Sequence, residues 1–408
     1  MYSVGLDYHQ NRSSLDILDA QGARFKFLDV KGNWTKLLET IDAQVPQPFN
    51  ICFEASCGYG HLYDQLARRA HSVQVAHPGN LHTIFRSKKK HDRIDASKIA
   101  KILYMDMVPR VHVPKSEIRQ WRSLIEFRRR LMGKIIGFKA QLRALCRGLG
   151  IVELPKGKKL FTIKGLKQLQ ELKLEDLSAL QRDLLLDELQ SFVKQKKRVE
   201  QELAKIAAKH PEIELLKSIP GVGIRTAEAF VAYVDDIHRF SKVNQIGSYF
   251  GVVPCEDSSS DKRRLGHITK DGPGTMRWLI CEAAWQGTQR SPTIRAFHKR
   301  VMNEDPDRRK IALVATGHYL LRVMAAMLRS GELWRESVKE EDLAPAAAPI
   351  KKKGPAAKGQ PDRLLLHDGA QVASQQCPIL RVDQNSIPQN PTDQEGPEPQ
   401  GGTEHGMN

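Results

Sequence analysis

The chain has 408 residues, of which 40% are hydrophobic, so it is long enough for several domains with buried cores and is not disordered as a whole. Its 64 Lys and Arg residues exceed its 47 Asp and Glu residues, and the resulting net charge of +17 favours a polyanionic partner such as nucleic acid. No apolar run approaches the roughly 20 residues of a membrane span, no signal peptide is evident, and the cysteines lack CxxC spacing, so we expect a cytoplasmic protein without a membrane partner.

The first part of the chain, residues 1–115, alternates short apolar runs with turns. The runs YSVGLDYH, SSLDILDA and ARFKFLDV precede a stretch with helical spacing, WTKLLETIDAQ, and a further apolar run, FNICFE. Period-two patterns between turn residues are typical of strands, and helical stretches between later strands are typical of βα units. We therefore expect an α/β domain in which hairpin-like strands precede βα units.

Four acidic residues stand out in this part by their context. Asp7 lies in the first apolar strand, Glu54 directly follows the apolar run ICF, and Asp92 and Asp95 are three residues apart at the start of a helix. Carboxylates gathered together repel one another unless a cation lies between them, and oxygen ligands favour Mg²⁺ or Mn²⁺. The alternative is that Asp92 or Asp95 caps the helix and that Asp7 starts a turn. For Asp92 alone the cap is favoured, but the set of four favours a metal site for phosphoryl transfer.

Residues 116–210 form a second part that is rich in Leu, Lys, Arg and Glu and predicts long helices. Apolar residues with four-three spacing are Leu185, Leu189, Phe192, Val199, Leu203 and Ile206. Lys196 occupies the one charged position of this seam. The spacing indicates a helical hairpin or a coiled coil, and it fits a helical layer within one subunit as well as a dimer.

Residues 211–335 form a third part, which opens with the segment SIPGVGIRTAEAFVAY. Gly221 and Gly223 allow a tight turn whose amides face a phosphate at a helix N-terminus, as in a helix-hairpin-helix element. An ordinary glycine-containing turn is the commoner meaning of PGVG, but the basic context favours the nucleic-acid interpretation. We therefore expect both glycines to contact nucleic acid.

The polar loop CEDSSSDKRRLGHITKDG follows in the same part. Its composition fits a flexible loop, but serine nucleophiles also need neighbouring cations that stabilise the scissile phosphate. The candidate cations, which also serve as nucleic-acid contacts, are Lys262, Arg263, Arg264 and Lys270. Residues 336–408 are rich in Ala, Pro, Gly and Gln and predict a disordered tail.

The order of GLD, FEASCGYG and KKHDRIDASKIA resembles the DEDD transposases of insertion sequences. This resemblance implies a RuvC-like N-terminal domain with an RNase H-like α/β fold, followed by an all-α coiled-coil segment and a mostly helical C-terminal domain. It also implies that Asp7, Glu54, Asp92 and Asp95 are the catalytic metal ligands.

The same family carries a conserved pattern with an essential serine in its C-terminal domain. The matching positions here are Pro254, Ser258, Ser259, Arg264, Gly266, Ile268, Lys270 and Gly272. The chain has Ser260 and Asp261 where the family has small glycines, which leaves both Ser258 and Ser259 as candidates for the catalytic serine. We take Ser258 as the catalytic serine, with Ser259 as the alternative. The resemblance covers residues 1–335.

The resemblance implies a transposase or site-specific recombinase that cuts and rejoins donor and target DNA, guided by a structured bridge RNA. It further implies a homo-oligomer, a dimer or tetramer, in which the carboxylates of one subunit lie near the serine of another. A structure-specific endonuclease of the Holliday-junction type needs only the carboxylates and the hairpin. A non-catalytic nucleic-acid-binding protein would have lost an acid, and all four are present.

Overall fold

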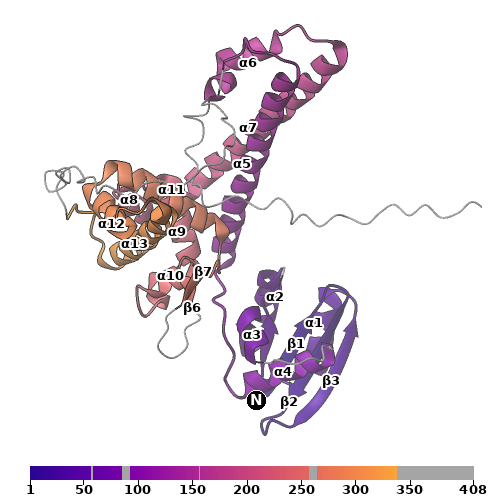
Figure 1. The fold of residues 1–408 in the computed structure, drawn as a ribbon. Helices are drawn as coiled ribbons and strands as arrows, with labels where there is room; N and C mark the ends of the chain where they lie inside the picture. Colours follow the sequence, from indigo (N-terminus) through magenta and orange to yellow (C-terminus); the bar gives the residue numbers. More distant parts are fainter. Residues whose placement is uncertain (57, 85–91, 156, 257–263, 338–408) are drawn as a thin grey trace, which may run out of the picture. The chain divides into compact units, whose positions relative to one another are not determined.

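The computed structural model of the chain describes residues 1–337 except residues 57, 85–91, 156 and 257–263 (Figure 1). It divides into two compact units. Unit 1 comprises Met1–Ile213 and Glu228–Arg239, and unit 2 comprises Glu214–Ala227 and the residues from Phe240 onward. The predicted disordered tail lies almost entirely outside the described residues.

Unit 1 begins with an α/β region. Its elements are β1 (Tyr2–Tyr8), β2 (Arg12–Leu18), β3 (Arg24–Lys31), α1 (Trp34–Gln44), β4 (Phe49–Glu54), α2 (Tyr59–Leu66), β5 (Ser72–Ala76), α3 (Pro78–Ile84) and α4 (Asp92–Tyr104). Among the described residues of this region, the strands form one sheet in the order β3-β2-β1-β4-β5. β2 is antiparallel to both β1 and β3, whereas β4 is parallel to β1 and β5. Hairpin strands thus precede βα units, which confirms the predicted α/β region.

Helices cover both faces of this sheet. On one face, alternate strand residues such as Leu6 and Phe53 pack with α1 and α2 in a buried apolar cluster. On the other face, Cys52 packs with residues of α3 and α4, among them Ile99 and Leu103. Because successive strand residues point to opposite faces, the positions between the residues of the first cluster face α4.

A helical arm follows within unit 1. Its elements are α5 (Ser116–Gly148), η1 (Gly157–Phe161), α6 (Ile163–Gln170) and α7 (Asp176–Ala207). The long helices α5 and α7 lie side by side (Figure 1). The predicted apolar seam lies in this contact, since Leu189, Val199 and Leu203 are buried. The long helices are therefore confirmed, while their pairing with a second subunit as a coiled coil stays a prediction.

The C-terminal part is mostly helical, as predicted. Its elements are α8 (Glu212–Lys217), α9 (Ile224–Val234), η2 (Ile237–Arg239), α10 (Gln245–Tyr249), β6 (Pro254–Glu256), β7 (Leu265–Ile268), α11 (Gly274–Arg290), α12 (Pro292–Met302), η3 (Pro306–Arg308) and α13 (Arg309–Ser330). Within unit 2, α13 packs against α11 and α12 and forms the core with them.

One expectation about apolar length needs correction. Among the described residues, the helical stretch Pro306–Ser330 is long and apolar enough to cross a membrane by length and composition. Half of its most apolar window, 50%, is buried inside the structure. The apolar side chains of α13 are therefore accounted for by the core of unit 2, because they pack against neighbouring helices.

Candidate active site

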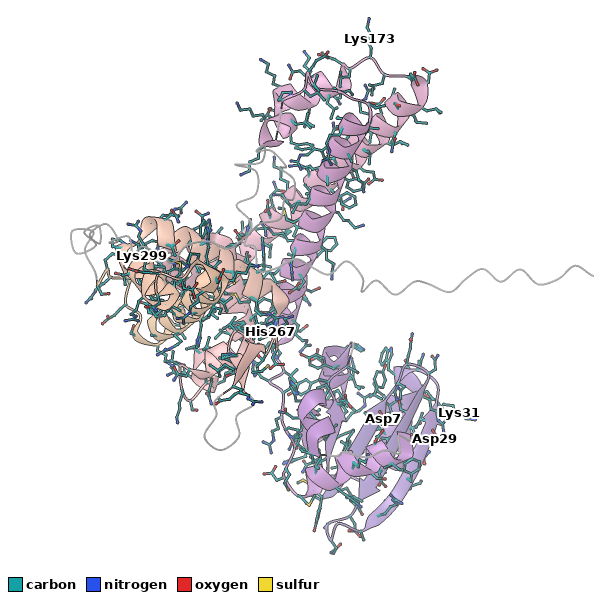
Figure 2. All side chains as sticks on the ribbon, viewed as in Figure 1. Asp7, Asp29, Lys31, Lys173, His267 and Lys299 are labelled. Atoms are coloured by element: carbon teal, nitrogen blue, oxygen red, sulfur yellow. The ribbon has the colours of Figure 1, made fainter. Side chains whose placement is uncertain are left out.

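Two of the predicted acids lie in the last two residues of neighbouring parallel strands. β1 and β4 pair in a register that sets Leu6 opposite Phe53, so Asp7 and Glu54 are the next residues along the two strands. Because Leu6 and Phe53 are buried on the α1 and α2 face, Asp7 and Glu54 point toward the α4 face. Figure 2 labels Asp7 on the sheet. Its side chain is 17% exposed.

Gly5 allows α4 to lie directly on β1. A Cβ added at Gly5 would lie 2.2 Å from the carbonyl oxygen of Ala96 and 2.2 Å from the amide nitrogen of Ala100. Both atoms belong to the helix backbone, which no side-chain rearrangement can move aside. Gly5 and Asp7 share one face of β1, so the close contact holds the first half of α4 beside Asp7.

A second contact defines the direction of α4. A Cβ at Gly22, in the turn between β2 and β3, would lie 2.7 Å from the ring of Tyr104 at the end of α4. This turn lies at the beginning of β1, because Leu18 pairs with Ser3. The start of α4 therefore lies toward the end of β1, where Asp7 is. Asp95 directly precedes Ala96 and is brought to the same edge of the sheet.

Nitrogen-bearing side chains accompany two of these carboxylates. The Nε2 atom of His9 lies 3.4 Å from Oδ2 of Asp7. Lys98 donates a hydrogen bond from Nζ to Oδ1 of Asp95 (3.0 Å), and its side chain is only 19% exposed. Sequence reasoning did not identify His9 and Lys98, although the i+3 spacing of Asp95 and Lys98 on a helix would have suggested that pair.

A further acid on the α4 face has a structural partner. Asp16 is buried and lies opposite Gly5 on β2. Arg24 donates to Asp16 through Nε (2.8 Å) and Nη2 (2.9 Å), and Nη2 also donates to the hydroxyl of Ser97 (2.9 Å). The hydrogen bonds that Arg24 donates to Asp16 raise the pKa of Arg24 above its ordinary value. Asp16 and Arg24 therefore tie α4 to the sheet, a role that the sequence pattern did not reveal.

The chemistry of the donor set fits a hard cation. Among the described residues, no group of three or more His, Cys, Asp or Glu is close enough to hold a metal ion, but the side chain of Asp92 is not among them. Asp7, Glu54 and Asp95 contribute carboxylate oxygens, which Mg²⁺ and Mn²⁺ prefer. Cys52 faces the same side of the sheet, and burial raises the pKa of its thiol to about 12, so it is not a thiolate ligand at neutral pH.

The glycines of the predicted hairpin have different environments. Gly221 has a φ of +95°, and a Cβ there would lie 2.4 Å from the amide nitrogen of Gly287 in α11. Gly221 is therefore required by the packing of the turn on α11. Gly223 is exposed directly before α9, and a Cβ there would meet no heavy atom within 4 Å. Only Gly223 is thus available to a ligand without a packing role.

The predicted serine loop connects two antiparallel strands, β6 and β7. The predicted residues that lie outside the described part of the chain are Ser258, Ser259, Lys262 and Arg263. Arg264 and Lys270 are described, and both are exposed. Lys270 has a φ of 60°, a left-handed conformation in the turn between β7 and α11. The hairpin therefore presents two of the predicted basic side chains to solvent.

Comparisons with known proteins match both regions. Residues 4–150 match the DEDD family of IS110 type, described as "Transposase", and residues 213–299 match the "Transposase IS116/IS110/IS902 family". The "Transposase for insertion sequence element IS1111A" of Coxiella burnetii is 27% identical over 57% of this chain and 64% of its own length. The "Probable family 20 transposase" of Pseudomonas aeruginosa is 26% identical over 59% of this chain and 71% of its own length. The "Transposase for insertion sequence element IS1328" of Yersinia enterocolitica is 24% identical over 69% of this chain and 82% of its own length.

Proposed function

The chain belongs to the DEDD transposases of insertion sequences, and from this premise we propose that it cuts and rejoins DNA with a divalent metal and a serine nucleophile. The observation that carries the proposal is the close approach of α4 to β1 at Gly5. This approach brings Asp95 to the edge of the sheet at which Asp7 and Glu54 lie. An acidic edge of this kind suits phosphoryl transfer, because a bound cation offsets the charge of the phosphate.

In this proposal Asp7, Glu54, Asp92 and Asp95 hold Mg²⁺ or Mn²⁺. A cation held by these residues would supply Lewis-acid stabilisation of the negative charge on the phosphate. Lys98 neutralises part of the carboxylate charge and holds Asp95 through its hydrogen bond, and His9 lies beside Asp7. Arg24 keeps α4 on the sheet through Asp16 and Ser97, so it acts as a positioning residue.

Ser258 is the proposed nucleophile, with Ser259 as the alternative. The serine oxygen attacks the scissile phosphorus, the bond from phosphorus to a deoxyribose oxygen breaks, and that oxygen leaves as a hydroxyl with the proton that the serine loses. Rejoining reverses these steps, because the phosphoserine ester conserves the bond. Arg264 and Lys270, together with Lys262 and Arg263, are proposed to contact the DNA phosphates.

Partners follow from the same proposal. The net charge of +17 and the family membership support donor and target DNA, and the resemblance supports a structured guide RNA. The same resemblance supports a homo-oligomer, a dimer or tetramer, in which carboxylates and serine come from different subunits. Gly223 is proposed to approach a phosphate at the start of α9, as in a helix-hairpin-helix element, whereas Gly221 supports the turn by packing.

Strand cleavage by matched carboxylate variants tests the acidic site. Asp7→Asn and Asp95→Asn should each lower Mg²⁺-dependent cleavage by about 100-fold or more, since each removes negative charge that holds the cation. Asp29→Asn is the control, because Asp29 lies on the outer strand β3, where it pairs with Arg12 of β2 (Figure 2). This variant should retain full cleavage. Undiminished cleavage by Asp7→Asn or Asp95→Asn would contradict the assignment.

Trapping a covalent intermediate separates the transposase from a structure-specific endonuclease. Cleaved DNA should stay attached to Ser258 when rejoining is blocked, Ser258→Ala should remove this adduct, and Ser259→Ala should retain part of the activity. Peptide mapping of the adduct identifies the residue, and a label on Ser259 would move the assignment by one position. Cleavage without any adduct would favour hydrolysis by the metal site alone.

A further inference from the structure

The helical arm of unit 1 carries a group of cations that lie over aromatic rings. Lys139 Nζ lies 5.1 Å and Arg143 Cζ lies 4.7 Å from the centre of the Phe161 ring. Lys134 Nζ lies 5.3 Å from the centre of the Phe192 ring. We define the arm patch by these residues and Lys196, which are contributed by α5, η1 and α7: Lys134, Lys139, Arg143, Phe161, Phe192 and Lys196.

The positive charge of the arm patch is poorly balanced. Among the described residues, no carboxylate lies within 4.0 Å of the side-chain nitrogens of Lys134, Lys139 or Arg143. Glu200 is 3.1 Å from Lys196, but it also accepts a hydrogen bond from Arg128 (2.8 Å). One carboxylate is thus shared by two cations, and the described residues provide no carboxylate within 4.0 Å of the other three.

The energetic consequence of this crowding is visible at Lys139. Burial lowers the pKa of its ammonium group, and the charges of Arg143 and Lys196 lower it further. An anion that entered the arm patch would relieve this repulsion. Cationic stems that merely cover aromatic surface would not need to converge on one ring, and Lys139 and Arg143 share Phe161 from neighbouring turns of α5.

The rings themselves argue against stacked bases. Phe161 and Phe192 are half-buried, Phe192 stacks on Phe138 with ring centres 5.5 Å apart, and cations lie over both rings. Single-stranded nucleic acids bind through bases that stack on exposed rings, whereas duplexes offer regularly spaced phosphates to cations. The arm patch therefore offers contacts to a phosphate backbone.

We propose that the arm patch binds the phosphate backbone of duplex DNA, at a site separate from the carboxylate edge of the sheet. This inference rests on the proposed DNA substrate and adds a second, sequence-independent contact to it. Phosphate contacts of this kind position the duplex without reading its bases.

The test compares two double variants of the full chain in the presence of EDTA, so that binding is measured without cleavage. Lys139→Gln with Arg143→Gln removes two cations of the arm patch. Lys167→Gln with Lys205→Gln is the control, because it removes the same charge from two exposed arm residues that pair with Glu171 and Glu202. The measured quantity is the affinity for a synthetic DNA duplex at several salt concentrations.

The patch variant should reduce the slope of log affinity against log salt by about 1.8, since each neutralised phosphate contributes about 0.9. At 0.1 M salt this corresponds to a loss of affinity of up to about 60-fold. The control variant should change the slope by less than half as much. Lys139→Arg with Arg143→Lys, which keeps both charges, should bind like the wild type and exclude a folding defect.

Four results would overturn the proposal. Equal losses in the patch and control variants would show that only net charge matters. A loss of RNA affinity with unchanged duplex DNA affinity would identify a different partner. Absence of duplex binding by the wild type would refute the DNA substrate together with the patch, whereas wild-type binding that the patch variant retains would refute the patch alone.

Discussion

Gly5→Ala tests whether the contact between α4 and β1 builds the acidic site. The new methyl group would lie 2.2 Å from two backbone atoms of α4, at Ala96 and Ala100. Roughly 1 Å of separation must open before these atoms reach ordinary van der Waals contact. Overpacking of this kind lowers the free energy of unfolding by about 1–3 kcal/mol. A shift of about 1 Å between Asp95 and Asp7 should also lower strand cleavage by about 100-fold.

The assay pairs urea unfolding with strand cleavage and uses Gly133→Ala as its control. Gly133 lies inside α5, and a Cβ there would meet no heavy atom within 4 Å, so this substitution should stabilise the helix by about 0.5–1 kcal/mol and leave cleavage unchanged. Wild-type stability and cleavage in Gly5→Ala would refute the reasoning. A loss of stability without any loss of cleavage would show that the contact supports the fold and not the acids.

Three further predictions concern single residues. Cys52 should resist alkylation at pH 8, because burial raises the pKa of its thiol to about 12, whereas the exposed Cys255 should react. Mass spectrometry of the labelled protein measures both reactions, and labelling of Cys52 would contradict its burial. Burial lowers the pKa of His318 from 6.5, so as the pH falls the unfolded chain binds a proton at His318 before the folded chain does. The free energy of unfolding should therefore fall as the pH drops below about 6.5. Urea titrations should show that His318→Gln weakens this pH dependence. Gly221→Ala should destabilise unit 2 by about 1–3 kcal/mol. Gly223→Ala should leave the melting temperature unchanged and weaken DNA binding. Equal melting temperatures for Gly221→Ala and the wild type would contradict the packing role of Gly221.

The elements of the sheet were predictable from local patterns, but their arrangement was not. Period-two alternation identified the strand that carries Asp7 and the apolar run that ends at Glu54. The pairing of β1 with β4 joins segments that are distant in the chain, and no local pattern specifies it. The parallel register that makes Asp7 and Glu54 neighbours therefore became visible only in the structure.

The position of α4 depends on residues whose importance was invisible in the sequence. Gly5 reads as one small residue in an apolar strand, yet its missing side chain is what admits the backbone at Ala96. In the sequence, Arg24 and Asp16 look like surface charges of a hairpin. In the structure, Arg24 donates hydrogen bonds to Asp16 and to Ser97 of α4. Such contacts join elements that are distant in the chain. The acids could therefore be predicted from the sequence, but the residues that hold them in place could not.

The two glycines of the PGVG turn show a similar difference. Sequence reasoning gave Gly221 and Gly223 the same role, because both permit a tight turn. The structure separates them, since Gly221 packs on the backbone of α11 while Gly223 is open. The partner of Gly221 comes much later in the chain, and the PGVG motif contains no information about it.

The most direct test of the carboxylate site is the binding of Mn²⁺ to the full chain, measured by calorimetry or by paramagnetic resonance without DNA. The wild type and Asp29→Asn should bind the ion with the same affinity, because Asp29 on β3 already accepts hydrogen bonds from Arg12 on β2. Asp7→Asn and Asp95→Asn should each weaken binding by about 10-fold or more, since each removes a charged oxygen ligand. Equal Mn²⁺ affinity in all four proteins would contradict a metal site at this edge of the sheet.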